Sequence, residues 1–290
     1  MSENVNEYDR LECVIDELSA DPNPSPDRAR EAVERLLGLL ECGSVRAAIC
    51  GPDGEWSAVT WVKRGILLGF RAGTIVDMTL TPPNQRAATF SFFDKDTYPP
   101  RVLKLSDGVR IVPGGSAIRR GAYVAPGVVC MPPSYVNVGA YIGTGSMIDS
   151  HALVGSCAQV GERVHLSAAA QLGGVLEPIN AAPVVIEDEV VVGGNCGVYE
   201  GTVVRSRAVL GAGVILTRST PVFDIVNETV YRASQGHPLV IPSGAVVVPG
   251  ARRISAAWAS EMNLSLVTPI IVKYRDDRTD AATALEESLR

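Results

Sequence analysis

A six-residue repeat of apolar positions is the feature that most limits how this 290-residue chain can fold. Counting in sixes from residue 118, and again after an interruption at residues 178–185, every position in phase carries an apolar side chain. The positions are Ile118, Val124, Cys130, Val136, Ile142, Ile148, Val154, Val160, Leu166, Leu172, Ile186, Val192, Val198, Val204, Leu210 and Leu216. Neither the 3.6-residue period of a helix nor the alternation of a lone strand explains this pattern. It predicts hexapeptide repeats that build a parallel β-helix.

Each hexad should supply one short strand and one turn, with the aliphatic side chain pointing inward and a small residue at the corner. Small residues follow the repeat position at Ala125, Gly143, Gly155, Gly161, Gly173, Gly193 and Gly211. If three hexads close one triangular coil, these repeats make about five coils. The aromatic residues between 108 and 221 are four tyrosines, which suits a narrow aliphatic interior.

The segment before the repeats predicts an α-rich cap for one end of the prism, because the stacked coils leave unpaired strands there. Helical apolar spacing occurs at residues 7–20 and 26–41, and the second stretch has Ser25 as N-cap, Pro26 in its first turn and Gly43 as C-cap. A hairpin around residues 51–54 and a helix near residues 61–70 should follow.

Beyond Pro221 the repeat loses phase, returns at Ile241 and Val247, and gives way to a β-branched run at residues 267–274 and a short helix at 280–289. The predicted organisation has three parts. They are an α-rich N-terminal domain (1–107), a β-helix (108–253) and a small C-terminal β/α cap (254–290).

Charge and hydropathy argue against several classes of partner. Lys and Arg number 26 against 32 Asp and Glu, a net charge of −6, and no segment concentrates positive charge. Nucleic acid and anionic membranes are therefore poor partners. No apolar run approaches the ~20 residues of a membrane span, and the N-terminus lacks the pattern of a signal peptide. The six cysteines have no paired spacing, so we expect reduced thiols in a cytoplasmic protein.

Beyond the repeats, the chain resembles the tetrahydrodipicolinate N-succinyltransferases, lysine-pathway enzymes of the hexapeptide acyltransferase superfamily. The resemblance runs from about Leu36 to the end, and VGSCAQVG followed by VHLS and GGVLEP is its most selective part. The remaining matching segments are LLECGSVRAA, WVKRGILLGFRAG, VRIVP, PSYVNVGAYIG, MIDS, IEDEVVVG, VYEG, SGAVVVPG and IIVKYRD.

This resemblance implies a left-handed coil and a transfer of the succinyl group from succinyl-CoA to the amine of tetrahydrodipicolinate, which reacts as open-chain 2-amino-6-oxopimelate. It also implies a homotrimer of parallel prisms with active sites between subunits, no tightly bound cofactor, and coenzyme A as a co-substrate. Trimer formation would cover flank residues of the prism that a monomer leaves partly in water, such as Tyr135, Val136 and Tyr141.

Two residues are candidates for binding the reacting amine and the carboxylates of the substrate. Arg110, in VRIVP, matches the substrate-binding position of the family, and a guanidinium suits a dicarboxylate. Asp149, in MIDS, follows inward Ile148 at a turn edge and matches the acid that binds the substrate amine and draws a proton from it. The alternatives are a solvated arginine at a domain junction and a turn aspartate that bonds its own backbone.

The chain departs from better-known family members at Gly197, where they carry a second acid three residues before the glutamate of VYEG. The proton could then pass to Asp149 alone, to Glu200, to water or to His151, whose position holds a tryptophan in some members. His151 could equally be a surface turn residue. His165 should be mostly structural, and the three histidines lie too far apart in the repeat for a metal site.

In this superfamily the pantetheine arm of coenzyme A lies along backbone amides where side chains are small. Candidates for that floor are Ala168, Ala169, Ala170, Gly193, Gly194, Gly211 and Ala212. Arg218 and Lys273 are candidate phosphate contacts. The small residues could also serve only the corners of the coil.

Two other functions fit the same fold. One is an acyltransferase with another acyl donor or amine, such as acetyl-CoA or a secondary-metabolite precursor, because Gly197 leaves room for it. The other is a non-catalytic hexapeptide scaffold, against which the retained VRIVP and MIDS motifs argue.

Overall fold

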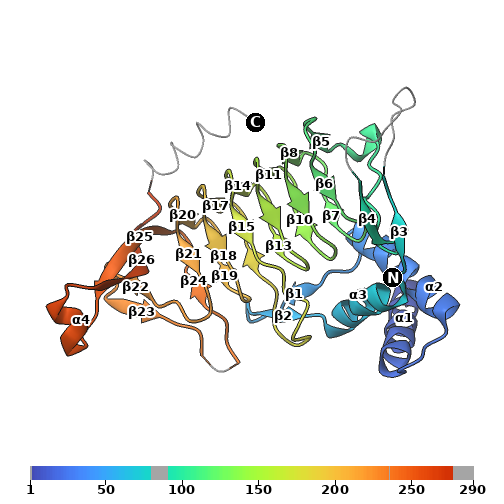
Figure 1. Cartoon of the computed structure of the whole chain (residues 1–290), viewed down its shortest axis with the longest axis horizontal. Coiled ribbons are helices and arrows are strands. Elements are labelled where there is room, and N and C mark those ends of the chain that lie inside the picture. Colours follow the sequence, from blue (N-terminus) through green and yellow to red (C-terminus); the bar gives the residue numbers. More distant parts are fainter. Residues whose placement is uncertain (1, 80–90, 235, 277–290) are drawn as a thin grey trace.

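The computed structural model describes residues 2–79, 91–234 and 236–276 and contains a parallel β-helix with helices at one end and a long β-ribbon at the other (Figure 1). The strands of the β-helix stack in three sheets, and up to β21 each strand pairs with the strand three positions further along the chain. The helix expected at residues 280–289 lies outside the described residues.

We call the three sides of the prism faces A, B and C. Face A consists of β7 (Tyr123–Val124), β10 (Tyr141–Ile142), β13 (Gln159–Val160), β16 (Val185–Ile186), β19 (Val203–Val204) and β24 (Val240–Ile241). Face B consists of β6 (Ala117–Ile118), β9 (Tyr135–Val136), β12 (Leu153–Val154), β15 (Gln171–Leu172), β18 (Gly197–Val198) and β21 (Ile215–Leu216). Face C consists of β5 (Arg110–Ile111), β8 (Val129–Cys130), β11 (Met147–Ile148), β14 (His165–Leu166), β17 (Val191–Val192), β20 (Val209–Leu210) and β25 (Ala245–Arg253).

The six-residue phase predicts the core of the prism correctly. All sixteen repeat positions are the second residue of a two-residue strand, and none is more than 5% exposed. Lateral pairs keep this register: Ile142 lies between Val124 and Val160 in face A. The fold class expected from the repeat is confirmed.

Small corner residues are required because successive coils approach closely. A Cβ on Gly155 would lie 2.2 Å from the backbone nitrogen of Gly174 and 2.5 Å from the carbonyl oxygen of Leu172. No side chain fits there without displacing the next coil.

The described stack is one layer longer than the predicted five coils, since faces A and B each contain six strands. The chain leaves the prism at β22 (Val222–Asp224) and β23 (Thr229–Tyr231) and then returns, with β24 pairing on β19 and β25 on β20. The returns at Ile241 and Val247 predicted from the sequence are therefore real extensions of the repeat.

The N-terminal segment has the expected helices, α1 (Ser2–Ala20), α2 (Pro26–Glu41) and α3 (Thr60–Ala72). Their apolar sides form a separate core that also packs against Val138 and Cys157 at an edge of the prism. Ser25 is the N-cap residue, but its side chain makes no capping hydrogen bond. The C-cap is Cys42, one residue earlier than expected, and Gly43 follows it with a φ of 74°. A left-handed residue after the cap is where glycine is favoured.

Short strands complete this end of the molecule. The predicted hairpin is β1 (Ala48–Cys50) and β2 (Trp56–Ala58), and a second antiparallel pair, β3 (Ile75–Asp77) and β4 (Phe93–Lys95), was not predicted. A 3-10 turn, η1 (Leu105–Asp107), precedes the prism.

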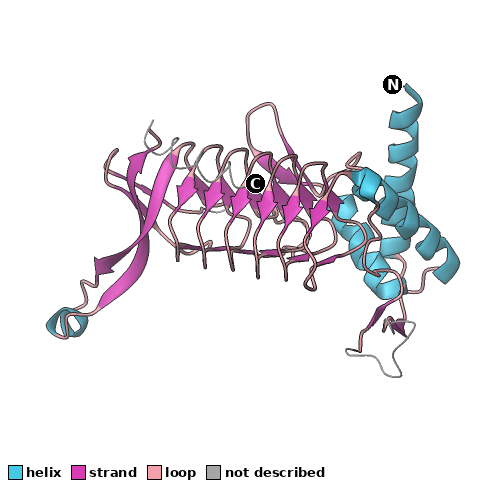
Figure 2. Ribbon diagram, turned by 90° about the horizontal axis from the view of Figure 1, so that it is seen from above, coloured by secondary structure: helices cyan, strands magenta, loops and turns pink. Residues whose placement is uncertain are grey.

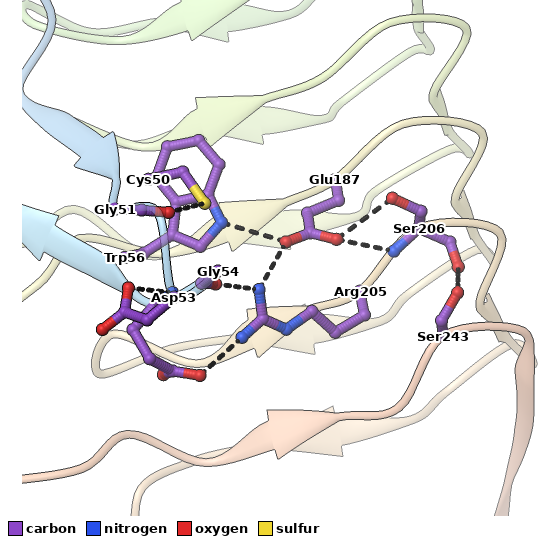
Figure 3. A network of polar contacts seen from close by, with 10 residues as sticks. Cys50, Gly51, Asp53, Gly54, Trp56, Glu187, Arg205, Ser206 and Ser243 are labelled. Atoms are coloured by element: carbon purple, nitrogen blue, oxygen red, sulfur yellow. Dashed lines mark hydrogen bonds and ion pairs between the residues drawn. The ribbon is translucent and has the colours of Figure 1, made fainter.

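The β1–β2 hairpin docks on face A through a half-buried polar network (Figure 3). The indole nitrogen of Trp56 donates to Glu187 at 3.0 Å, and Arg205 bridges Glu187 at 2.8 Å and Glu55 at 2.9 Å. Ser206 donates to the same Glu187 carboxylate from its backbone and its hydroxyl. Burial alone would raise the pKa of Glu187, but these hydrogen bonds outweigh it and hold the pKa below its usual value.

Tyr141 on face A is covered by the guanidinium of Arg46, which lies 3.7 Å from the ring centroid, and Val136 is fully buried inside the prism. The expectation that a single chain leaves Tyr135, Val136 and Tyr141 partly in water is therefore wrong for Val136, while Tyr141 stays partly exposed beside Arg46. Val136 occupies an inward repeat position, and the N-terminal segment covers face A. Tyr135, on face B, is 37% exposed.

At the other end, β25 pairs antiparallel with β26 (Ser265–Tyr274) to form a ribbon that reaches away from the prism and carries α4 (Ala257–Glu261) at its tip (Figure 2). The ribbon crosses the boundary placed at residues 253 and 254, and the division into 1–107, 108–253 and 254–290 stays a prediction. Among the described residues, no helix is long and apolar enough to cross a membrane. The six cysteines are free thiols.

Candidate functional site

Arg110 lies in β5 at the end of face C nearest the helices and is exposed (Figure 1). Its backbone N–H donates to the carbonyl oxygen of Val128 at 2.9 Å, and it is the lateral partner of Val129. Partners in neighbouring strands point to the same side of a sheet, so Arg110 projects from the outer side of face C. No ion pair joins its guanidinium to another described residue, which leaves its donors open to a ligand.

Asp149 begins the turn between β11 and β12, directly after inward Ile148, and is partly exposed. Its backbone N–H donates to Leu166 at 2.9 Å in the next coil. One carboxylate oxygen, Oδ1, accepts the N–H of Ser150 at 2.7 Å. The Asp149 carboxylate thus accepts a hydrogen bond from its own turn, as expected if it were only a turn aspartate. Its second oxygen, Oδ2, faces no hydrogen-bond donor among the described residues.

The two residues share a sheet but do not touch. β5 and β11 are separated by β8 in face C, so their backbones are about 10 Å apart at the usual strand spacing. One chain therefore places an arginine and a carboxylate two coils apart on the same side of the prism.

The small residues expected to line coenzyme A lie on the same edge of the prism as Asp149. We call this the CB edge: the turns that join a strand of face C to the next strand of face B. Backbone hydrogen bonds stack these turns, from Ala169 to Ser150 at 2.9 Å, from Asn195 to Ala168 at 3.0 Å and from Gly213 to Gly194 at 2.9 Å. The predicted floor residues on this edge are Ala168, Ala169, Ala170, Gly193, Gly194, Gly211 and Ala212.

Only part of that floor is open. Ala168 and Ala212 are exposed, Ala169, Gly193, Gly194 and Gly211 are partly exposed, and Ala170 is buried. Gly193 also has a structural role, because a Cβ there would lie 2.6 Å from the carbonyl oxygen of Leu210. Small residues on this edge can therefore satisfy the tight corner of the coil and still leave the backbone open to a ligand.

The two residues predicted to contact the phosphates of coenzyme A, Arg218 and Lys273, do not lie on the CB edge. Arg218 lies on a different edge, in the turn after β21, where its backbone N–H donates to Glu200 at 2.8 Å. Lys273 is in β26, two strands beyond β20, and its ammonium lies 3.1 Å from Asp276.

The other candidate proton acceptors and the remaining histidines lie in different parts of the fold. His151 is in the Asp149 turn, exposed, with a left-handed φ of 62° and its backbone N–H directed to Pro133. Glu200 is on the edge that holds Arg218. His165 is buried in β14, and His237 is in a loop bridged to Ser234. Within the described part of the chain, no three metal-ligating side chains cluster closely enough to hold an ion.

Thiol chemistry has no support here. Burial raises the pKa of Cys157 to about 12 and also raises the pKa of Cys196. A thiolate is the nucleophilic form, so neither cysteine is activated.

Tyr199 is a feature that sequence reasoning missed. Its ring folds back over Gly197, where a Cβ would lie 2.4 Å from Cε2 and 2.8 Å from the hydroxyl oxygen of Tyr199. The signal was present: Gly173 and Tyr199 each follow a repeat position, so the repeat stacks them in adjacent coils once the interruption between them is counted.

A cavity of about 530 Å³ adjoins Tyr199 and is lined by the loop that interrupts the repeat. Lys63 of α3 holds this loop, because its buried ammonium donates to the carbonyl oxygens of Pro178 at 3.0 Å and Ala181 at 2.9 Å. Burial lowers the pKa of Lys63. The lining residues are Gly173, Gly174, Val175, Glu177, Pro178, Ala181, Tyr199, Glu200, Thr217 and Arg218.

The prism and its edge place the protein among the hexapeptide-repeat transferases, and comparison with known sequences agrees. A family profile described as the hexapeptide repeat of succinyl-transferase matches residues 183–218. Another, described as the N-terminal part of tetrahydrodipicolinate N-succinyltransferase, matches residues 14–72.

Curated relatives cover nearly the whole chain. A 2,3,4,5-tetrahydropyridine-2,6-dicarboxylate N-succinyltransferase of Albidiferax ferrireducens is 43% identical over 272 residues, which cover 92% of this chain and 91% of the relative. The enzyme of the same name from Azoarcus sp. is 42% identical, with 97% and 98% covered. That of Nitrobacter winogradskyi is 39% identical, with 90% of each covered. The chain belongs to the tetrahydrodipicolinate N-succinyltransferase family, as its motifs predict.

Proposed function

We propose that the protein transfers the succinyl group of succinyl-CoA to the amine of 2-amino-6-oxopimelate, the open form of tetrahydrodipicolinate, in lysine and diaminopimelate biosynthesis. The observation that carries this proposal is the 39–43% identity to N-succinyltransferases over nine-tenths or more of the chain. Asp149 supports it, because its turn on the CB edge adjoins the open turns of small residues.

The chemistry requires a neutral amine held against the thioester carbon and no covalent enzyme intermediate. Arg110 binds a substrate carboxylate with its open guanidinium donors. Asp149 orients the amine through the oxygen that its own turn leaves unbonded, and it draws a proton as the amide bond forms. Thiol and imidazole groups are not needed for this step, although His151 stands next in line should Asp149 not act as the base.

Coenzyme A then lies along the CB edge, with its amides bonded to backbone groups of the floor residues. Lys273 and Arg218 stay predicted phosphate contacts. Their separation on the single chain requires either that one of them does not act or that they serve from different subunits. We further propose a cytoplasmic homotrimer with active sites between prisms, because Tyr135 and Ile215 are exposed on face B and the outward apolar residues of face C, Val129, Met147, Val191 and Val209, are partly exposed.

A second candidate function is the same transfer with another acyl donor or amine. Tyr199 over Gly197 favours it, because the ring changes the shape and charge of the place where better-known members carry an acid.

Initial rates distinguish the candidates. The purified protein, tetrahydrodipicolinate and either succinyl-CoA or acetyl-CoA are mixed, and coenzyme A release is followed with a thiol reagent. A kcat/KM at least tenfold higher with succinyl-CoA supports the proposal. An equal or higher value with acetyl-CoA identifies the second candidate with acetyl-CoA as donor, and no amine-dependent release with either donor contradicts the proposal.

A further inference from the structure

Tyr199 occupies a cradle that two glycines leave open on face B. A Cβ at Gly173 would lie 2.7 Å from Cδ1 of Tyr199, and one at Gly197 would lie 2.4 Å from Cε2. Both distances are shorter than real Cβ contacts, so neither position accepts even an alanine while the ring is there. The two glycines belong to adjacent coils, because Gly197 is in β18 and Gly173 directly follows β15. The ring therefore covers both coils.

The backbone of Tyr199 is held from two sides. The backbone N–H of Tyr199 donates to Leu216 at 2.9 Å, and its carbonyl oxygen accepts both the N–H and the hydroxyl of Thr202. The ring then points back along β18, which brings its hydroxyl oxygen within 2.8 Å of the point where a side chain at Gly197 would begin. A group at the end of such a braced ring is preorganised for a ligand.

The hydroxyl lies beside the edge used by the proposed reaction. Gly197 directly follows the Gly193–Cys196 turn of the CB edge, and the Tyr199 side chain also lines the 530 Å³ cavity. No hydrogen bond joins this hydroxyl to another described residue. A phenol hydroxyl donates one hydrogen bond and also accepts. The ligand group that uses its donated proton is an oxygen acceptor, either a carboxylate or a carbonyl.

We propose that Tyr199 is a specificity-determining residue of this enzyme: its ring replaces a side chain at position 197, and its hydroxyl donates a hydrogen bond to an oxygen of a bound substrate. This inference rests on the proposed function. It makes Gly173, Gly197 and Tyr199 one unit, in which the glycines exist to admit the ring. It also means that the group at this place is a hydroxyl donor rather than a carboxylate, so its role in the proposal is to bind and orient the substrate.

Tyr199→Phe tests the hydroxyl alone, because phenylalanine keeps the ring in its cradle. We expect the thermal midpoint to stay within experimental error of the wild type, kcat to change less than threefold and one Michaelis constant to rise about tenfold. A rise for the amine acceptor assigns the hydrogen bond to a substrate carboxylate, and a rise for acyl-CoA assigns it to the acyl group. Both Michaelis constants within twofold of the wild type would overturn the proposal.

The pairing with Gly197 has an independent test. Gly197→Ala should lower the thermal midpoint and kcat/KM in the wild type, because the new methyl group meets the ring. In a Tyr199→Val background the same change should cause no further loss, since the ring is gone. Equal losses in both backgrounds would contradict the pairing.

The two proposals fail in different ways. A wild-type protein that transfers no succinyl group overturns the proposed function, and the role of Tyr199 with it. A wild type that transfers succinyl normally, alongside a Phe variant with unchanged Michaelis constants, overturns the role of Tyr199 only.

Discussion

The backbone N–H of Ala169 donates to the carbonyl oxygen of Ser150 at 2.9 Å, and this bond stacks the Asp149 turn directly against the first turn of the small-residue edge. The candidate acid and the candidate coenzyme A floor are thereby neighbours in one ladder of backbone hydrogen bonds. Because that ladder is part of the coil itself, the acid and the floor keep their relative positions for as long as the prism is folded.

Arg110→Ala should raise the Michaelis constant for the amine acceptor more than it lowers kcat. A carboxylate has the same charge in the ground and transition states, so a residue that binds it contributes mostly to binding. Arg110→Lys keeps the charge but not the paired donors, and it should restore binding only in part. Steady-state kinetics on the three proteins check this. A loss confined to kcat would show that Arg110 acts in the chemical step instead.

Asp149→Asn should reduce kcat by about 10² to 10⁴, the range for a positioned acid–base group, while coenzyme A affinity is preserved. Asparagine keeps the shape and the Ser150 contact and removes the charge. With Gly197 in place of a second acid, Asp149 should carry more of this load. Glu162→Gln, a change at another exposed turn carboxylate, serves as the control and should be silent. If Asp149→Asn retains more than a tenth of the wild-type kcat, the proton belongs elsewhere and His151 is the next residue to change.

The stability supplied by the Glu187 network should depend on pH in one direction. Because its pKa is lowered in the folded protein, the network is at full strength above the ordinary value of 4.5 and is lost as pH falls through the lower folded-state value. Glu187→Gln should cost about 1–3 kcal/mol of unfolding free energy at pH 7 and less at pH 4.

Urea unfolding of the wild type and Glu187→Gln at both pH values measures this. Glu189→Gln, which removes a partly exposed carboxylate paired with Arg163 and Arg207, is the matched control and should cost at most about 1 kcal/mol. A stability difference between wild type and Glu187→Gln that grows as the pH falls would contradict the expected pH dependence.

Static light scattering should give a mass about three times the 30.7 kDa of one chain. Apolar side chains are exposed on face B and partly exposed on face C, whereas the N-terminal segment covers face A, so faces B and C are the surfaces for self-association. A mass near that of a single chain at micromolar concentration would exclude the trimer.

The repeat pattern determines how much of this structure the sequence predicts. The inward positions can be predicted because each must be apolar whatever its neighbours are. The segments that cover the outer faces of the prism cannot be predicted in this way, since they depend on contacts between distant parts of the chain. Tyr141 and Tyr135 have equivalent places in their hexads, yet only Tyr141 is covered by Arg46.

The candidate site divides in the same way. Turns one coil apart stack at a fixed sequence spacing wherever the repeat is uninterrupted, so the stacking of the Asp149 turn on the turn that contains Ala168 follows from counting. The return of Tyr199 over Gly197 depends on a side-chain rotamer and on the interruption at residues 178–185, which hides the neighbouring coil from a simple count. The separation of Arg218 from Lys273 depends on the excursion through β22 and β23, for which the repeat contains no signal.

A donor competition tests the proposed transfer most directly. The protein is incubated with tetrahydrodipicolinate and equal concentrations of succinyl-CoA and acetyl-CoA, and the products are identified by mass spectrometry. We expect N-succinyl-2-amino-6-oxopimelate as the main product, absent without enzyme and strongly reduced with Asp149→Asn. A predominantly N-acetylated product, or no acylated product at all, would contradict the proposed transfer.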